Sequence, residues 1–162
     1  MAIIKPNNNT LSAITALPAA IPTGKVLQVK YMQSSSGAGL SGTSLVDTAL
    51  TNTITPSSSS NKILIQFVLQ SKLEANPEGY GTAIKRAISG GATTTLDEMA
   101  AFYNFNNGTG GEIGVVSPSF YEDSPSTTSE ITYTIQVKGS NTQPVQIPNT
   151  GFNSMILMEI SA

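Results

Sequence analysis

The sequence has 162 residues, a formal net charge of −2 and 11% charged residues, which is less than half of the ~25% of an average globular chain. It contains no cysteine and no histidine, which excludes disulfide frameworks, thiolate catalysis, Ser-His-Asp triads and most zinc sites. Ser, Thr and Asn supply 51 residues, a composition typical of β-rich proteins exposed outside a cell. No apolar run approaches the roughly 20 residues of a membrane-spanning helix, so we expect no membrane insertion.

Residues 1–22 differ from the rest of the chain. Pro6, Pro18 and Pro22 discourage a helix, and a Lys-Pro-Asn sequence after the first apolar residues interrupts the plan of a secretory signal. This segment therefore predicts an extended N-terminal arm that attaches the protein to a partner. The apolar side chains that we expect to make this attachment are Ile3, Ile4, Leu11, Ile14 and Leu17.

From Gly24 onwards, apolar and polar residues alternate with a period of two, which predicts strands. In the first of these strands, we expect Leu27, Val29 and Tyr31 to lie on a buried face. The clearest one is KILIQFVLQ, whose second face is also partly apolar because it includes Leu64 and Val68. Turn clusters rich in Ser, Pro, Gly and Asn separate the strands. The predicted strands of the first half are 25–33, 43–54 (interrupted near Asp47), 62–70 and 82–88.

In the second half, segment 131–139 alternates cleanly, and Pro118 predicts a bulge or an edge within segment 113–122. Segment 98–105 suits a short helix or a strand, and its Phe-Tyr-Asn-Phe end favours a strand. The closing strand is 154–160. These patterns predict an all-β fold, an antiparallel sandwich or jelly roll of about eight strands over residues 23–162. With five Phe and five Tyr, the core should consist mainly of Ile, Val, Leu and Met.

Charge is distributed unevenly along the sequence. Residues 1–86 contain seven basic and three acidic residues, whereas residues 87–162 contain one basic and seven acidic residues. Basic strand residues such as Lys85 and Arg86 could pair with acids of a neighbouring copy. Alternatively, folding brings the two halves together within one chain and removes the asymmetry. The basic residues are few and are not interleaved with aromatic residues, which disfavours nucleic acid as a partner.

Candidate catalytic residues are few. Asp97-Glu98 and Glu122-Asp123 are the adjacent carboxylate pairs, and paired carboxylates can hydrolyse glycosides when they are set about 5–9 Å apart. Both pairs stand beside turns, where we expect ordinary solvated residues, so we expect no enzymatic activity. Neither a calcium loop nor a phosphate-binding motif is present, so no cofactor or metal is expected. Tyr103, Phe105 and Asn107 flank a glycine-rich tip and are candidates for contact with a receptor.

Four segments taken together resemble a family of small structural proteins of tailed bacteriophages, frequent among marine and cyanobacterial phages. They are LPAAIPTGKVLQV (17–29), ITPSSSSNKILI (54–65), YEDSPSTTSEITYTIQV (121–137) and MILMEI (155–160). The resemblance covers most of residues 17–160 in the same order. It implies a compact β domain on the virion surface that is usually trimeric and attached by its N-terminal end. It leaves open whether the attachment point is the capsid or the tail.

Two functions remain possible at this stage. The first is a trimeric capsid decoration or cement protein, which binds the major capsid protein through its arm. The second is a tail fibre or receptor-binding tip, which is held by a tail or adaptor protein and recognises a host glycan or outer-membrane protein. In either case, strands with a partly apolar second face need a covering surface. We expect a subunit interface built from Leu64, Val68, Lys85, Arg86, Met155 and Leu157.

Overall fold

The computed structural model describes residues 24–73, 80–98, 112–139, 144–147 and 153–162. Within these residues the protein consists of ten β-strands and contains no helix, and thus no helix long and apolar enough to cross a membrane. The strands are β1 (Val26–Ser34), β2 (Ala38–Ser41), β3 (Val46–Ile54), β4 (Lys62–Leu73), β5 (Tyr80–Ile88), β6 (Thr93–Glu98), β7 (Glu112–Asp123), β8 (Ile131–Gly139), β9 (Pro144–Ile147) and β10 (Asn153–Ile160).

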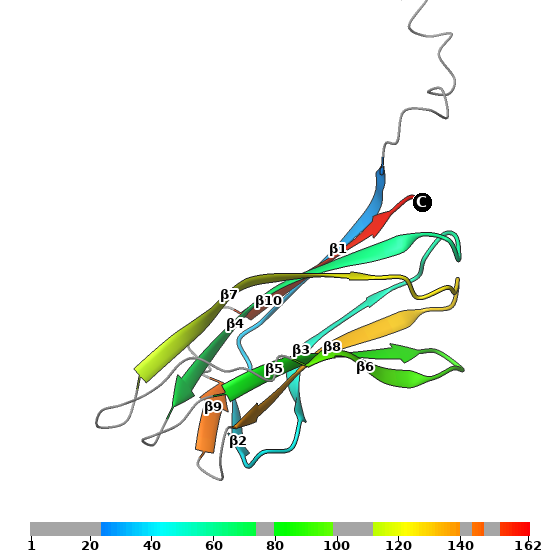
Figure 1. Ribbon diagram of the computed structural model, residues 1–162. Helices are drawn as coiled ribbons and strands as arrows, with labels where there is room; N and C mark the ends of the chain where they lie inside the picture. Colours follow the sequence, from blue (N-terminus) through cyan, green and yellow to red (C-terminus); the bar gives the residue numbers. More distant parts are fainter. Residues whose placement is uncertain (1–23, 74–79, 99–111, 140–143, 148–152) are drawn as a thin grey trace, which may run out of the picture.

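The strands form two antiparallel sheets that lie face to face as two layers (Figure 1). Sheet A has the order β1-β10-β4-β9-β2, and β7 pairs with β4 along the other side of that strand. Sheet B has the order β3-β8-β5-β6. Segments far apart in the sequence are therefore neighbours: the first strand pairs with the last one, from Val26 opposite Ile160 to Ser34 opposite Asn153. The predicted all-β antiparallel sandwich is confirmed.

Seven of the eight predicted strands are confirmed in position, and the eighth, segment 98–105, lies outside the described residues apart from Glu98. Pro118 lies in β7, where the pairing with β4 shifts register between Phe67 and Leu69, so the predicted bulge is confirmed. The sequence prediction missed β2, β6 and β9. They are short, and their Gly, Thr or Pro residues were interpreted as loops.

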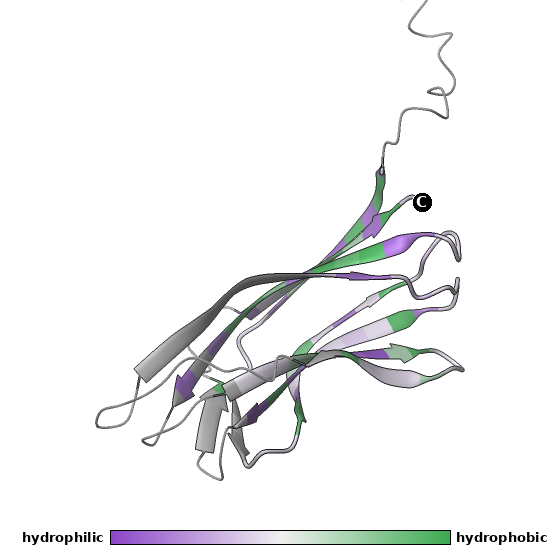
Figure 2. Cartoon of the chain, in the orientation of Figure 1, coloured by the Kyte–Doolittle hydropathy of each residue, from purple (hydrophilic) through white to green (hydrophobic). Residues whose placement is uncertain are grey.

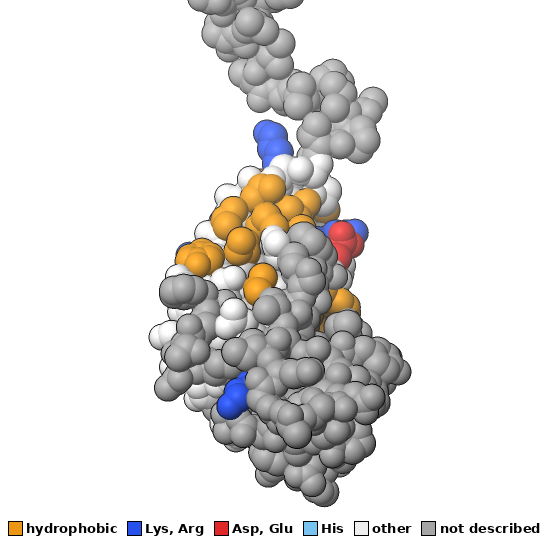
Figure 3. Space-filling view, turned by 90° about the vertical axis from the view of Figure 1, so that its left-hand side faces the viewer, with side chains coloured by type: hydrophobic (Ala, Val, Ile, Leu, Met, Phe, Trp, Pro, Cys, Tyr) orange, Lys and Arg blue, Asp and Glu red, His pale blue; other side chains and the backbone are white. Residues whose placement is uncertain are grey.

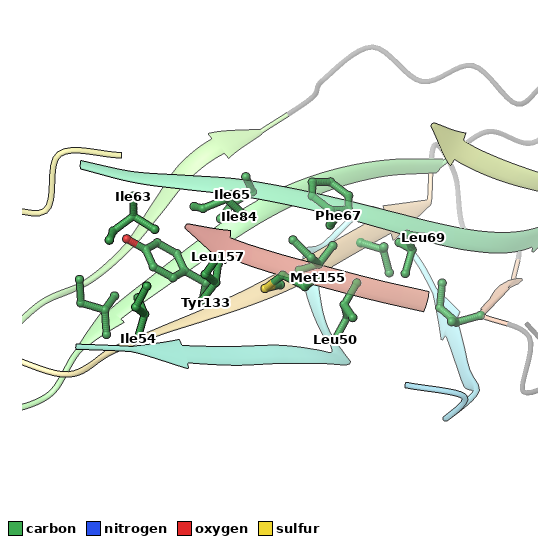
Figure 4. Packing of buried hydrophobic residues seen from close by; sticks show 14 residues of the cluster. Leu50, Ile54, Ile63, Ile65, Phe67, Leu69, Ile84, Tyr133, Met155 and Leu157 are labelled. Atoms are coloured by element: carbon green, nitrogen blue, oxygen red, sulfur yellow. The ribbon is translucent and has the colours of Figure 1, made fainter. Parts of the chain in front are cut away.

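The hydrophobic core lies between the two sheets and is built mainly by alternate residues of strands such as β4, β8 and β10 (Figure 4). Among the described residues its aromatic members are Phe67 and Tyr133, and the remainder is aliphatic or Met, as the composition predicted. Among the described residues, those with the largest fully buried side chains come from β3, β4, β8 and β10: Leu50, Ile54, Ile63, Ile65, Leu69, Ile131, Tyr133, Ile135, Met155 and Leu157.

Two facing assignments made from the sequence are wrong. Leu27, Val29 and Tyr31 of β1 were expected on a buried face, but they are 45%, 56% and 62% exposed. Met155 and Leu157 of β10 were expected at a subunit interface, but both side chains are completely buried in the core of one chain. Side chains alternate between the two faces of a strand. The outward-facing residues of β10 are therefore Ile156 and Met158.

Candidate interaction surface

The outer face of sheet A carries a cluster of apolar side chains on three adjacent strands, here named the apolar face. Three of its residues on β1 are exposed, and the others on β4 and β10 are half-buried. The residues on β4 and β10 alternate with fully buried residues that point into the core. The apolar face consists of Val26, Val29, Tyr31, Leu64, Val68, Ile156, Met158 and Ile160.

The strand register places these residues in rows across the sheet. Met158 of β10 lies opposite Val29 of β1 on one side and Leu64 of β4 on the other. One row along, Ile156 lies opposite Tyr31 and Gln66. Residues that face each other across an antiparallel pair share one face of the sheet and touch. The rows thus make one continuous apolar surface, visible as the hydrophobic cluster in Figure 3.

Charge lies at the margin of the apolar face. Lys62 ends the row that contains Ile160, and its Nζ donates to Oε1 of Glu122 at 2.6 Å. Both side chains of this ion pair are about half exposed, at 44% and 56%. Among the described residues of the outer-face rows that run from β1 to β4, Lys62 is the one with a charged side chain, and Glu122 lies beyond Leu64 on β7. The centre of the face is therefore neutral, and its one charged pair is internally compensated.

The chain enters the domain at the end of the apolar face. A Cβ atom on Gly24 would lie 3.1 Å from Cγ2 of Ile160, so the backbone passes directly against this residue. The backbone N–H of Lys25 donates to Oγ of Ser161 at 3.0 Å, and the N–H of Ser161 donates to the carbonyl oxygen of Lys25 at 2.9 Å. Gly24 and Lys25 are thus held beside this face.

A buried carboxylate holds this end of the sandwich together. Glu159 is completely buried, and its Oε1 accepts hydrogen bonds from Asn61 Nδ2 at 2.6 Å and from the backbone N–H and hydroxyl of Ser57, each at 2.7 Å. Its Oε2 accepts one from Gln28 Nε2 at 2.6 Å. Burial by itself would raise the pKa of Glu159, but the donors Asn61, Gln28 and Ser57 together lower it to about 2. The carboxylate links β1, β10 and the turn between β3 and β4.

A second buried polar cluster joins the two sheets. Asp123, at the end of β7 in sheet A, accepts hydrogen bonds from Arg86 Nη1 at 2.7 and 3.0 Å and from the Tyr133 hydroxyl at 2.6 Å. Arg86 and Tyr133 are paired residues of β5 and β8 in sheet B. Burial, followed by the hydrogen bond to Asp123, raises the pKa of Tyr133 well above its ordinary value. The cluster fixes one sheet relative to the other, and with it the orientation of the two outer faces.

The outer face of sheet B is polar. Its rows contain threonines, as where Thr132 lies between Thr53 and Ala87. Lys85 of β5 forms an ion pair with Asp47 of β3, which also accepts a hydrogen bond from Gln136 at 2.8 Å. The hydrogen bond from Lys85 is the main cause that lowers the pKa of Asp47 below its ordinary value, against the opposing effect of burial. The outer face of sheet B is therefore suited to contact with solvent.

The residues proposed from the sequence have different outcomes. Leu64 and Val68 lie on the apolar face, half-buried within one chain. Lys85 and Arg86 form ion pairs within the chain, and two ion pairs, Lys62–Glu122 and Arg86–Asp123, join the basic first half to the acidic second half. The attachment residues and the candidate receptor contacts lie outside the described residues: Ile3, Ile4, Leu11, Ile14, Leu17, Tyr103, Phe105 and Asn107.

The carboxylates do not form a catalytic arrangement where the structure describes their side chains. Glu122 and Asp123 are neighbours in β7, so they point to opposite faces of the sheet. Glu122 pairs with Lys62 outside, whereas Asp123 pairs with Arg86 inside. Asp123 was expected to be solvated, and that expectation is wrong because only 5% of the residue is exposed. Across the described part of the chain, no group of three or more Asp, Glu, His or Cys residues could hold a metal ion.

Sequence reasoning missed Ile156, Met158 and Glu159 as residues that shape this end of the molecule. In MILMEI every position before Glu159 is apolar, so alternation could not separate the outer face from the core face. The exposed residues of β1 were noticed but were assigned to the wrong environment. The signal that could have identified Glu159 is its position as the one acidic residue within an otherwise apolar closing strand.

Comparisons with known proteins identify the fold. No protein-family profile and no curated protein sequence matches the chain. A chain in the structure of infectious bursal disease virus, Gx strain, superposes with a TM-score of 0.50 and 13% identity over 82% of this chain. Chains of the Gt strain (TM-score 0.47, 10% identity, 90% of this chain) and of the VP2 subviral particle of the same virus (0.46, 10%, 91%) also match. The protein spans about two-fifths of the length of each of these chains.

Proposed function

We propose that this protein is a structural component of a virion, and more specifically a trimeric decoration or cement protein on the outer shell of a tailed bacteriophage capsid. The observation that carries the proposal is the two-sheet sandwich that it shares with a chain of infectious bursal disease virus. The neutral polar composition and the phage-like segments of the sequence support it. A fold by itself does not imply a function, so the proposal depends on the experiments below.

The proposed mechanism is adhesion without chemistry. The apolar side chains of the arm, from Ile3 to Leu17, would be buried on the major capsid protein, and an extended segment can add backbone hydrogen bonds to its partner. Linking three such arms in one trimer multiplies weak contacts through their effective concentration. Gly24, where the described domain begins, lies against Ile160 at one end of the sandwich, so an arm that binds the shell would leave the rest of the domain projecting from it.

The number of copies per virion tests this function against the alternative, a tail fibre or receptor-binding tip. A cement protein covers the shell and should be present in hundreds of copies, whereas a fibre should be present in tens at most. Quantitative gel densitometry of purified virions, calibrated on the major capsid protein, measures this number directly. A count in the tens would reject the decoration role and favour the fibre, and absence from the virion would reject both.

The attachment role of the arm has its own test. A chain without residues 2–20 should remain folded but should no longer bind empty capsid shells in a co-sedimentation assay. Point variants provide a matched control, because Ile14→Asp with Leu17→Asp adds the same charge as Asn8→Asp with Asn9→Asp. We expect the first pair to abolish binding and the second to weaken it far less. Full occupancy of shells by the truncated chain would contradict the assignment of the arm.

A further inference from the structure

We infer that the apolar face of sheet A is the surface on which neighbouring copies of this chain pack against one another. The inference deepens the proposed function, because it names the face that would hold the oligomer together. Val29 and Tyr31 are 56% and 62% exposed on an edge strand, and they continue across β10 and β4 into half-buried Ile156, Met158 and Leu64. Contiguous exposed apolar surface of this kind marks interaction sites in soluble proteins.

The size of the face suits the apolar centre of an interface between proteins. It occupies three adjacent strands, β1, β10 and β4, over the eight residues of β10. At about 4.8 Å between strands and about 3.3 Å per residue, it measures roughly 14 by 26 Å. That area is about half of the ~800 Å² per partner of a standard stable interface. Polar groups adjoin it, with Gln33 further along β1 and the Lys62–Glu122 pair at its margin, as in interfaces with an apolar core and a polar rim. Gln66, between Leu64 and Val68, is a neutral polar residue within the face.

Charge favours a second copy as the occupant. When a surface meets its own copy, every uncompensated charge on it approaches like charges, and such contacts cost several kcal/mol. The rows from Val29 to Leu64 and from Tyr31 to Gln66 contain no charged side chain among the described residues, and Lys62 at the rim is neutralised by Glu122. Copies that turn this face towards a shared three-fold axis bring its equivalent residues near one another, and a face without net charge allows this without repulsion.

The position of the arm root agrees with this occupant. Gly24 lies against Ile160 at the end of the apolar face, so copies that pack by this face bring the starts of their arms together. Attachment through several arms at once requires such closeness, because the effective concentration falls as the distance between linked sites grows. A three-fold axis beside the apolar face would generate the trimer that we proposed above.

The test uses the full chain and light scattering after size exclusion, at physiological salt and at about 1 M salt, where the Debye length is about 3 Å. We expect a mass three times the 16.9 kDa of one chain at both salts. Tyr31→Glu and Met158→Glu place a charge in each copy of the face. They should raise the dissociation constant at least about 100-fold and yield monomers, since like charges would meet across the contact.

The matched control is Thr53→Glu, which adds the same charge to an exposed position on the outer face of sheet B. It should leave the mass unchanged. Tyr31 is so exposed that its substitution should not unfold the chain, and far-ultraviolet circular dichroism verifies this. A monomeric wild-type chain, or glutamate variants of both residues that keep the wild-type mass, would overturn the inference. A wild-type monomer that still decorates shells would overturn it while leaving the proposed function intact.

Discussion

On the outer face of sheet A, the row through β10 reads Val29, Met158 and Leu64, whereas on sheet B the row through β8 reads Thr53, Thr132 and Ala87. Each row contains β-branched residues, Val29 in the first and Thr53 and Thr132 in the second, and such residues pack well on a pleated surface whether they carry a methyl or a hydroxyl group. Strand propensity therefore does not explain the difference between the faces. Figure 2 shows that strands of both sheets contain hydrophobic as well as hydrophilic residues. What differs is the medium that each face meets, which is water for sheet B and, as we infer, another copy for sheet A.

The largest expected effect concerns the cluster that fixes the two faces relative to each other. Asp123→Ala leaves the guanidinium of Arg86, only 17% exposed, without its carboxylate. Removing one partner of a buried ion pair costs about 3–5 kcal/mol, and we expect a loss of this size in the free energy of unfolding measured with urea. The neighbouring Glu122→Ala removes an exposed pair and should cost about 0–1 kcal/mol. Equal losses for the two variants would contradict the cross-sheet role of Asp123.

The next effect separates the two sides of β10. Leu157→Ala removes a fully buried side chain and should cost about 2–5 kcal/mol at any protein concentration. Met158→Ala truncates a half-buried residue of the apolar face and should cost roughly 1 kcal/mol when the chain is dilute. If copies pack by this face, the cost of Met158→Ala should grow with protein concentration, since association stabilises the folded state. Thermal unfolding over a dilution series measures both.

A smaller effect is expected from Glu159, which ties the end of sheet A to the turn before β4. The folded-state pKa of about 2 lies below the ordinary value of 4.5, so this carboxylate stabilises the fold above about pH 4.5. That contribution is lost progressively as the pH falls towards 2. Glu159→Gln places an amide NH2 or carbonyl among the donors Asn61, Ser57 and Gln28, and should cost about 1–3 kcal/mol at neutral pH.

The same variant also tests how Glu159 affects stability in acid. Between pH 4.5 and 2, the unfolding free energy of Glu159→Gln should decline less steeply than that of the wild-type chain, because the group that takes up the proton is gone. Urea unfolding at a series of pH values, followed by tyrosine fluorescence, gives the two slopes. Parallel slopes would mean that Glu159 does not titrate with a lowered pKa.

The smallest effect is expected on the polar face. Asp47→Asn removes the charge that pairs with Lys85 on the outer face of sheet B, where 49% of the aspartate side chain is exposed. Exposed pairs contribute about 0–1 kcal/mol and are screened by salt, so the difference from wild type should vanish at about 1 M salt. The pKa of Asp47 is lowered, so any stability from this pair is present above the ordinary pKa and is lost on acidification below it.

Some of this organisation could be predicted from the residues alone. In β4, one face is entirely apolar, with Ile63, Ile65 and Phe67, whereas the other face includes Lys62 and Gln66. The three residues of the apolar face are buried in the core. Segment 131–139 behaves in the same way. Its second face consists of polar residues, so only its apolar face can point into the core. Where alternation is clean, the burial of apolar surface decides which face lies inside.

Other features depended on partners distant in the sequence. Met155 and Met158 are the same residue type in one apolar run, yet one is in the core and the other on the outer face. Asp123 follows Glu122 beside a turn, and only the approach of Arg86 and Tyr133 from the other sheet makes it a buried acceptor. Neither the run nor the acidic pair contains this information locally.

The sequence by itself determined the all-β class, the aliphatic core and the absence of cysteine and histidine chemistry, because period-two patterns and composition are local properties of the chain. Only the tertiary structure decided that β1 is an edge strand with Val29 and Tyr31 exposed, and that these residues join Ile156 and Met158 in one apolar face. The reason is physical: the environment of a side chain depends on which strands pair and where the opposite sheet ends, and both are set by contacts between residues more than 100 positions apart.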